Sequence, residues 1–279
     1  VSGRLDTDHF VCLVKQDHVD LESMAAKLKI TAQLKGRSMK LYGYCGIYCL
    51  NESDTDVSGM IDRAKLAEES ILGDHVQPFA VFDDSMRRIY MDQVEIMGEY
   101  ESAIANGEFK VYYQPVVEAA TGNLVSAEAL VRWVHPQRGM VSPAAFIPAL
   151  ESGGQISKLD WFVADHVHKT ILKCYQEGSP VVPVSVNLSW MDFYDDGLIE
   201  RLLDIFRGNT LRNGDMRLEI TETSYAALES DRASILKQLR GAGAKILLDD
   251  FGSGYSSFGM LKQYDFDILK LDMTFTRQI

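Results

Sequence analysis

The sequence lacks the marks of secreted, membrane-spanning and nucleic-acid-binding proteins. It shows no signal-peptide pattern, and no apolar run approaches the roughly 20 residues needed to cross a bilayer. Its formal net charge of −12 argues against binding a nucleic-acid polymer, because contacts to many phosphates require a basic surface. A small phosphorylated ligand remains compatible with this charge, since a bound metal ion supplies positive charge locally. We expect a cytoplasmic protein with no membrane segment in this chain, which a region outside it could still tether to a membrane.

Cysteine is scarce, with four residues among 279 and no CxxC spacing. The apolar fraction of 46% is ordinary for a globular protein, so the chain builds a core that needs no disulfide. Cys45 and Cys49 are expected on one face of a strand, as small core side chains. We expect reduced thiols, and a disulfide or metal role is the alternative.

Glycine-rich nucleotide motifs are also absent. No GxGxxG turn follows the first strand segment, so a Rossmann fold has little support. Strand and helix patterns alternate instead, and the first third has strand segments at 9–14, 40–50 and 75–84 and helical segments at 20–34 and 56–72. A charged amphipathic helix at 85–107 follows, and we predict that it links two domains.

After Gly107, six apolar strand segments alternate with helical segments, which is typical of a parallel sheet buried on both faces. The helical segments lie at 143–152, 158–177, 196–207, 224–241 and 256–264. Each strand carries one polar residue at or near its carboxyl end: Gln114, Glu128, Asn187, Glu219, Asp249 and Lys270.

Two arrangements of these strands compete, an open doubly wound sheet and a (β/α)8 barrel. A barrel brings the carboxyl ends of its strands to one mouth, whereas an open sheet does not bring six strand ends to one point. We therefore predict an α/β protein with a (β/α)8 TIM-type barrel. Six of its strands are visible, so the last part of the barrel is expected to be missing from this chain.

Four of the strand-end residues form a set of oxygen ligands: Glu128, Asn187, Glu219 and Asp249. Three carboxylates at one mouth would repel one another and raise each other's pKa. A divalent cation removes that cost, and oxygen ligands without histidine or cysteine suit Mg²⁺ or Mn²⁺. Asp250 could hold a second metal or orient water, and Lys270 could contact a phosphate oxygen or a metal-bound hydroxide. Two metals about 4 Å apart would clamp a displacement at phosphorus.

Each of these residues alone has a simpler interpretation. A carboxylate at a strand end is usually a surface charge or a helix cap, and Asp250 could cap a helix that begins near Ser256. Asn187 could begin a turn, and DFGSGYSS could be only a connecting loop. Its DFG is not a kinase signal, because the other kinase motifs are absent. The joint occurrence of four oxygen ligands and a lysine on successive strands favours the metal site.

Seven short motifs follow one another in the second part of the chain. They are YYQPVV, the triplet Glu128-Ala129-Leu130 within SAEALVRW, SPAAFIPALESGGQISKLDWFV, VSVNLS, LEITET, LLDDFGSGYSS and LKLD. In this order they resemble the EAL-domain family, cyclic-di-GMP phosphodiesterases. The resemblance implies an EAL domain over 108–279 that stops before its last strands. It also implies hydrolysis of one phosphodiester bond of cyclic di-GMP, which gives linear pGpG.

The resemblance also implies a role for each matching residue. The ligands of two Mg²⁺ or Mn²⁺ ions are Glu128, Asn187, Glu219 and Asp249, with Asp250 at the second ion. Lys270 helps to hold the nucleophilic water, and Glu222 steadies the loop after the fifth strand. The substrate contacts are Gln114, Leu130 and Arg132, with the Arg132 guanidinium directed at a phosphate. The family's glutamate on the seventh strand and glutamine near the eighth have no assigned counterpart here, and Trp190 stands where the family often has a basic residue.

The first third, 1–84, resembles the second half of a GGDEF domain, the diguanylate cyclase fold. The segment GRLDTDHFVCLV takes the place of the signature hairpin, and Asp6-Thr7-Asp8-His9-Phe10 stands where the family has Gly-Gly-Asp-Glu-Phe. Without the two glycines and the glutamate, the module is expected to be inactive as a cyclase. It could bind GTP as a regulator, or it could be a structural or dimerising remnant.

Three functions stay open: a metal-dependent cyclic-di-GMP phosphodiesterase, a non-catalytic receptor for the same ligand, and an interaction module without a ligand. Every metal ligand of the family that falls within the chain is intact, which favours the enzyme because receptors typically lose some of them. The family often forms homodimers through its barrels, and a homodimer of this chain stays an open possibility.

Overall fold

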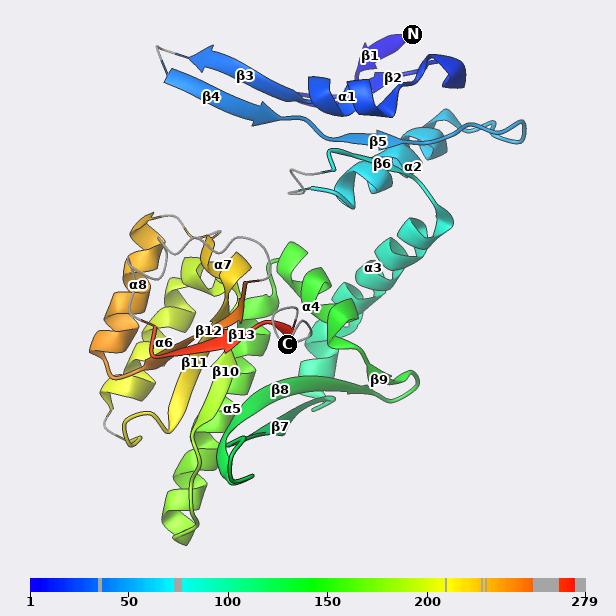
Figure 1. The fold of residues 1–279 in the computed structure, drawn as a ribbon. Helices are drawn as coiled ribbons and strands as arrows, with labels where there is room; N and C mark the ends of the chain where they lie inside the picture. The colour runs from blue at the N-terminus through cyan, green and yellow to red at the C-terminus, as the bar shows by residue number, and fades with distance from the viewer. Residues whose placement is uncertain are drawn as a thin grey trace. The chain divides into compact units, whose positions relative to one another are not determined.

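The computed structural model describes residues 1–34, 37–72, 77–208, 210–226, 228, 230–252 and 266–273. The chain divides into two compact units, Val1–Glu95 and Ile96–Ile279 (Figure 1). The boundary falls within helix α3, Asp84–Ala105, which is the helix expected at 85–107. Among the described residues, no helix combines the length and the apolar character that a membrane span requires.

Among its described residues, the first unit contains three two-stranded sheets, the helices α1 and α2, and the first part of α3. Its elements are β1 (Ser2–Arg4), β2 (Phe10–Cys12), η1 (Gln16–His18), α1 (Leu21–Lys27), β3 (Lys29–Leu34), β4 (Arg37–Tyr42), β5 (Cys45–Ile47), α2 (Val57–Glu69) and β6 (Phe79–Val81). β1–β2 and β3–β4 are antiparallel pairs, and β5–β6 is parallel. Helix α2 packs closely against β5, because a Cβ on Gly46 would lie 1.7 Å from the Ala64 carbonyl oxygen. Only glycine fits this contact.

Two expectations for this unit are wrong. The helix expected at 20–34 ends at Lys27, and the β-branched residues Ile30 and Thr31 instead pair with β4. The expected strand 40–50 is broken after Tyr42, so that Cys45 lies on β5 while Cys49 lies beyond the end of β5 and is exposed. Cys49 is therefore not a core residue. All four cysteines are described, and each is a free thiol.

The second unit is built on one mixed sheet. Its elements are β7 (Phe109–Val117), β8 (Leu124–His135), β9 (Gly139–Val141), α4 (Pro143–Ser152), α5 (Ile156–Glu177), β10 (Val184–Asn187), η2 (Trp190–Tyr194), α6 (Asp196–Arg207), β11 (Met216–Thr221), α7 (Glu222–Ala226), α8 (Ser230–Gly241), β12 (Lys245–Phe251) and β13 (Ile268–Leu271). The strand order is β7-β8-β10-β11-β12-β13, with β9 paired to β8. The six expected strands are therefore confirmed, but the expected helix 256–264 lies outside the described residues.

The sheet is not wholly parallel. Strands β8, β10, β11, β12 and β13 run parallel, whereas β7 is antiparallel to β8. Only a short turn separates β7 from β8, and Gly122 adopts a positive φ of 72° in it. A parallel connection needs a dozen or more residues, so this turn allows only a hairpin.

The strands follow one another in chain order across the sheet, and helices α5, α6 and α8 lie on one of its faces (Figure 1). A doubly wound sheet would reverse its strand order and carry helices on both faces. The observed order is the one a barrel has, while closure into a complete (β/α)8 barrel stays a prediction.

Two apolar clusters stabilise the second unit. The larger lies between the sheet and its helices, with Val186, Leu218 and Leu248 from the strands packed against Leu202 and Leu239. The smaller joins α3 and α4 to β7 and β8 through the rings of Tyr100, Phe109, Trp133 and Phe146. Since alternate strand residues point to opposite faces, the apolar residues on the helix side leave the intervening polar residues on the other side.

Candidate functional site

The polar residues of the sheet gather on the face that the helices leave open. The strand register places Asn187 opposite Glu219, Glu128 opposite Ser185, and Asp249 opposite Thr221. These positions alternate with the buried core residues of the same strands, so their side chains share one face. The structure thus brings together five of the predicted site residues: Glu128, Asn187, Glu219, Asp249 and Lys270.

Lys270 is the centre of this carboxylate cluster. Its Nζ donates to Glu128 Oε2 at 2.9 Å, to Asp249 Oδ2 at 3.1 Å, and to Glu219 Oε1. Asn187 Nδ2 donates to the other oxygen of Glu128 at 3.0 Å. One lysine faces three carboxylates, so the cluster keeps an excess of negative charge when all of them are ionised.

Burial and neighbouring charge shift the pKa values of these groups. Glu219 is fully buried, and its burial, opposed by Lys270, raises its pKa to about 7. Burial lowers the pKa of Lys270, but its hydrogen bonds to Glu128 and Glu219 outweigh this effect and the pKa is raised overall. For Asp249, burial is outweighed by hydrogen bonds from Glu219, the Asp250 N–H and Lys270, so the pKa falls.

One oxygen of this cluster fits a missing ligand. Glu219 Oε2 is buried and accepts no hydrogen bond from an N–H or O–H donor of the described residues. A buried carboxylate oxygen without a partner is costly, and three carboxylates with an amide form the all-oxygen set that Mg²⁺ or Mn²⁺ prefers. The residues present therefore fit a divalent cation.

Asp250 lies at an irregularity of the sheet. The pairing of β12 with β13 shifts between Leu248 and Phe251, and Asp250 has a φ of 54°, a conformation that side chains other than glycine rarely adopt. Such a bulge re-aims a side chain. Asp250 is exposed, and its pKa is raised by partial burial and by the charges of Asp249 and Asp272. Its charge thus lies near the cluster, although none of the hydrogen bonds within the cluster involves its side chain.

Glu222 holds the backbone that follows β12. It is buried at the start of α7, and its Oε2 accepts a hydrogen bond of 2.9 Å from the Gly252 N–H. Gly252 has a φ of 99°, a left-handed value that suits glycine. The glutamate thus contacts the first residue of the loop it was predicted to steady, while the rest of that loop lies outside the described residues.

The three predicted substrate contacts lie on the β7–β8 hairpin. Gln114 stands opposite Glu128, and Leu130 and Arg132 lie two and four residues beyond Glu128 on the same strand face. Arg132 Nη1 donates to the Val131 carbonyl at 2.8 Å. These side chains therefore line the same open face as the carboxylate cluster, in positions from which a ligand at the cluster could be reached.

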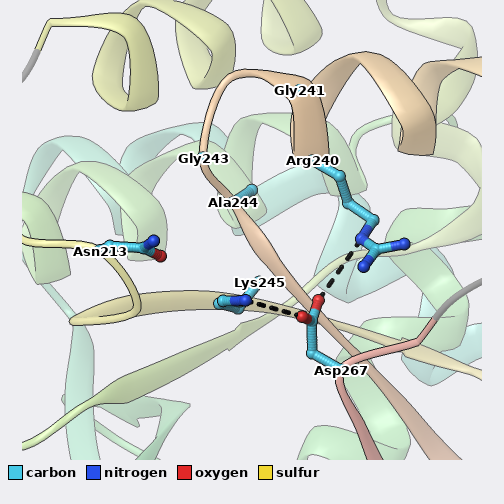
Figure 2. Close-up of a pocket in the computed structure, with 7 residues that line it drawn as sticks. All are labelled: Asn213, Arg240, Gly241, Gly243, Ala244, Lys245 and Asp267. Atoms are coloured by element: carbon cyan, nitrogen blue, oxygen red, sulfur yellow. Dashed lines mark hydrogen bonds and ion pairs between the residues drawn. The ribbon is translucent and has the colours of Figure 1, made fainter.

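A second feature of the sheet is a pocket of about 310 Å³ (Figure 2). It is lined by Asn213, Arg240, Gly241, Gly243, Ala244, Lys245 and Asp267. Lys245 opens β12, and Asp267 precedes β13, so the pocket lies at the amino ends of strands whose other ends carry the cluster. Asp267 there bridges Lys245, at 2.9 Å, and Arg240, at 3.5 Å. We interpret this pocket as a structural ion-pair site.

In the first unit, the predicted signature segment forms the turn between β1 and β2. His9 Nδ1 lies 2.8 Å from Asp6 Oδ1 and 3.2 Å from Asp8 Oδ1. The hydrogen bond with His9 lowers the pKa of Asp6 to about 2, and the same bond raises the pKa of His9. All three side chains are at or near the surface and satisfy one another, so this turn needs no bound ion.

Sequence reasoning missed a group of acids beside the cluster. Glu151, Asp160 and Asp192 converge on Ser189, two residues after Asn187. Asp192 is fully buried, which is rare for an aspartate. The only signal for it in the sequence was its place in the VNLSWMD stretch, directly after the predicted ligand Asn187.

Comparison with known proteins supports one family. A family model described as EAL domain matches residues 97–279. The cyclic di-GMP phosphodiesterase PdeR of Escherichia coli is 28% identical over 284 residues, which cover 100% of this chain and 43% of PdeR. The cyclic di-GMP phosphodiesterase RocR of Pseudomonas aeruginosa is 31% identical over 196 residues, which cover 70% of this chain and 50% of RocR.

Comparison with solved structures supports the same family. A PaMucR phosphodiesterase in complex with c-di-GMP has a TM-score of 0.60 and 31% identity, covering 66% of this chain and 74% of that one. The chain spans about two fifths of the length of curated relatives such as PdeR and the bifunctional diguanylate cyclase/cyclic di-GMP phosphodiesterase MucR of Pseudomonas aeruginosa, of which it covers 41%. With two thirds of its residues matched by the family model, this chain belongs to the EAL domain family.

Proposed function

We propose that this protein hydrolyses one phosphodiester bond of cyclic di-GMP to give linear pGpG, with Mg²⁺ or Mn²⁺ at the carboxylate cluster. The observation that carries the proposal is the meeting of Glu128, Asn187, Glu219, Asp249 and Lys270 on one open face, with a buried Glu219 oxygen that accepts no hydrogen bond from an N–H or O–H donor of the described residues. Relatives with this activity and a related structure that holds c-di-GMP supply the substrate class.

In this proposal the metal ligands are Glu128, Asn187, Glu219 and Asp249, and Asp250 belongs to a second ion. When bound, two such ions would lower the pKa of water and stabilise the charge of an in-line displacement at phosphorus. The water loses one proton as its oxygen forms a bond to phosphorus, the bond from phosphorus to the 3′ oxygen breaks, and the 3′ oxygen takes up one proton, so that one water molecule is added in total. The product is a linear dinucleotide with a 5′ phosphate.

The remaining residues bind and orient. The ammonium group of Lys270, raised in pKa, stays protonated at neutral pH and donates hydrogen bonds that hold the attacking water. The Arg132 guanidinium offers two parallel donors to a phosphate, and Gln114 and Leu130 contact the nucleotide beside it. Glu222 fixes the backbone at Gly252 and so steadies the start of the loop that follows β12, the strand that carries Asp250.

The test is product chromatography after incubation of the purified protein with cyclic di-GMP, with and without Mg²⁺ or Mn²⁺. We expect pGpG only when metal is present. Glu128→Ala should abolish the reaction, because it removes a metal ligand and an acceptor of both Lys270 and Asn187. Glu118→Ala is the matched control, since Glu118 is an exposed acid in the turn between β7 and β8.

Other outcomes separate the remaining functions. Intact substrate in every lane, together with tight binding by calorimetry, would overturn the enzyme and support a non-catalytic receptor. Absence of both turnover and binding would leave an interaction module. The GGDEF-like assignment of 1–84 stays a separate proposal, which GTP binding to that unit would support.

A further inference from the structure

The turn that follows β10 is held by three acidic side chains from three different elements. The Ser189 N–H donates to Asp192 Oδ2 at 2.9 Å and lies 3.4 Å from Asp160 Oδ2. The Ser189 hydroxyl donates to Glu151 Oε1 at 2.7 Å. Glu151 lies on α4, Asp160 on α5 and Asp192 on η2. One serine thus ties this turn to both helices that precede β10.

Asp160 and Asp192 form a carboxyl–carboxylate pair. They are hydrogen-bonded to each other, and Asp192 is fully buried. Throughout the described part of the chain, no lysine, arginine or histidine forms an ion pair with either of them. The charged groups that face the pair are the acids Glu151 and Asp195, which add negative charge. Two adjacent carboxyl groups without a cation share one proton, because both cannot ionise at low cost.

The turn at Ser189 directly follows the strand end that contributes Asn187 to the carboxylate cluster. The β10–β11 ladder ends at the pair Asn187–Glu219, and the next N–H, that of Leu188, donates to the Glu219 carbonyl at 2.8 Å. Ser189 is the following residue. The backbone is therefore fixed before Asn187 by the ladder and after it by the acids, while the Asn187 amide reaches Glu128.

We propose that Asp160 and Asp192 are positioning residues which share one proton, clamp the Ser189 N–H and thereby set the direction of the Asn187 side chain toward Glu128. Neither acid contacts the carboxylate cluster itself. The kinetic part of this inference rests on the proposed phosphodiester hydrolysis, whereas the clamp on Ser189 does not.

The first test compares Asp160→Leu and Asp192→Leu with Asp160→Asn in the purified protein. The leucine variants should lose about 10- to 100-fold in kcat/KM for cyclic di-GMP, the range for partners that orient a metal ligand. Asp160→Asn should stay near the unmodified protein, because an amide donates a hydrogen bond to Asp192 as a protonated acid does. Asp165→Leu is the control on the same helix and should have no effect, because the ion pair that Asp165 forms among the described residues is with the exposed Lys169.

The second test isolates the N–H itself. Ser189 has a φ of −74°, which proline adopts without strain, so Ser189→Pro removes the clamped donor while Ser189→Ala removes only the hydroxyl. Hydrogen–deuterium exchange of the amides at 186–195 measures how firmly this turn is held, and the measurement does not depend on catalytic activity. We expect faster exchange in Ser189→Pro and Asp160→Leu than in Ser189→Ala and Asp160→Asn.

The outcomes separate the two proposals. If the unmodified protein does not turn over cyclic di-GMP, the proposed function fails, and the exchange experiment still decides the clamp. Equal exchange and equal kinetics in Ser189→Pro and Ser189→Ala would overturn the positioning role. If Asp160→Leu does not fold, the comparison of Ser189→Pro with Ser189→Ala carries the test. A loss of activity in Asp160→Asn as large as that in the leucine variants would also overturn the positioning role.

Discussion

Lys270 supplies the one positive charge that touches the three carboxylates of the described cluster. Its hydrogen bonds to Glu128, Glu219 and Asp249 offset repulsion that would otherwise destabilise the fold in the absence of metal. The same lysine is expected to hold water during the reaction. Replacing Lys270 should therefore lower both the stability of the metal-free protein and its turnover, and the two losses should be separable.

We predict that Lys270→Met lowers turnover of cyclic di-GMP by about 100-fold or more, a typical loss for a positioned group in proton and water chemistry. Without metal the variant should also melt at a lower temperature, because three carboxylates then lack a cation. Added Mn²⁺ should recover most of the melting temperature and little of the activity. Lys169→Met, an exposed lysine on α5, is the control for charge loss.

At the level of elements, one aspartate joins the amino ends of β12 and β13 to α8. Asp267 accepts from Lys245 Nζ at 2.9 Å and from the Ile246 N–H at 3.0 Å, and it lies 3.5 Å from Arg240 Nε. Burial opposes ionisation of Asp267, but these partners outweigh it and lower its pKa. Figure 2 shows both cations directed at this carboxylate. Only 15% of the Asp267 side chain is exposed, whereas the two cations are 43% and 33% exposed, so solvent screens part of these ion pairs.

We therefore expect Asp267→Asn to lower the free energy of unfolding by about 1–3 kcal/mol, because two cations lose their counter-charge. Chemical denaturation would measure this. Lys245 and Asp249 are four residues apart on β12, about 13 Å along an extended strand, so turnover well below the melting temperature should be unchanged. A large loss of turnover with unchanged stability would show that the pocket serves the reaction and is not a structural site.

For the whole molecule, the residues that could be predicted were those that obey strand periodicity. Glu128, Glu219 and Asp249 alternate with core residues, so one register decides their common face. The same alternation predicts that Lys270, on the neighbouring strand β13, lies on this face as well. The sequence order of the strands also predicted their order in the sheet, since helical connections place successive parallel strands side by side.

What could not be predicted depends on tertiary contacts. Strand β7 is antiparallel to β8, because the short connection between them allows only a hairpin, whereas strand and helix alternation along the chain predicted a parallel sheet. The end of α1 at Lys27 depends on pairing between Ile30 and the later strand β4, which local helical periodicity does not report. The clamp on Ser189 joins acids that lie 29 and 38 residues before it in the chain, and no local pattern marks such a meeting.

The last prediction concerns the stability of the whole chain against pH. Burial raises the pKa of Glu219 to about 7 and that of Asp192 to about 6, above the ordinary values of 4.5 and 3.8. Between about pH 4.5 and 7 the folded protein therefore binds more protons than the unfolded chain, and its free energy of unfolding falls as pH rises. Thermal melts from pH 5 to 8 without metal should show this decline.

A divalent cation should reverse much of the decline, because it binds the ionised form of Glu219 and so competes with the proton. We expect Mn²⁺ to raise the melting temperature more at pH 8 than at pH 5.5. Glu219→Gln should remove the Glu219 part of the metal-free decline, leaving the part due to Asp192, and should remove the pH-dependent part of the Mn²⁺ effect, since its amide does not titrate. An equal Mn²⁺ shift at both pH values in the unmodified protein would place the ion elsewhere than at Glu219, and the carboxylate cluster would then be an internally balanced charge group instead of a metal site.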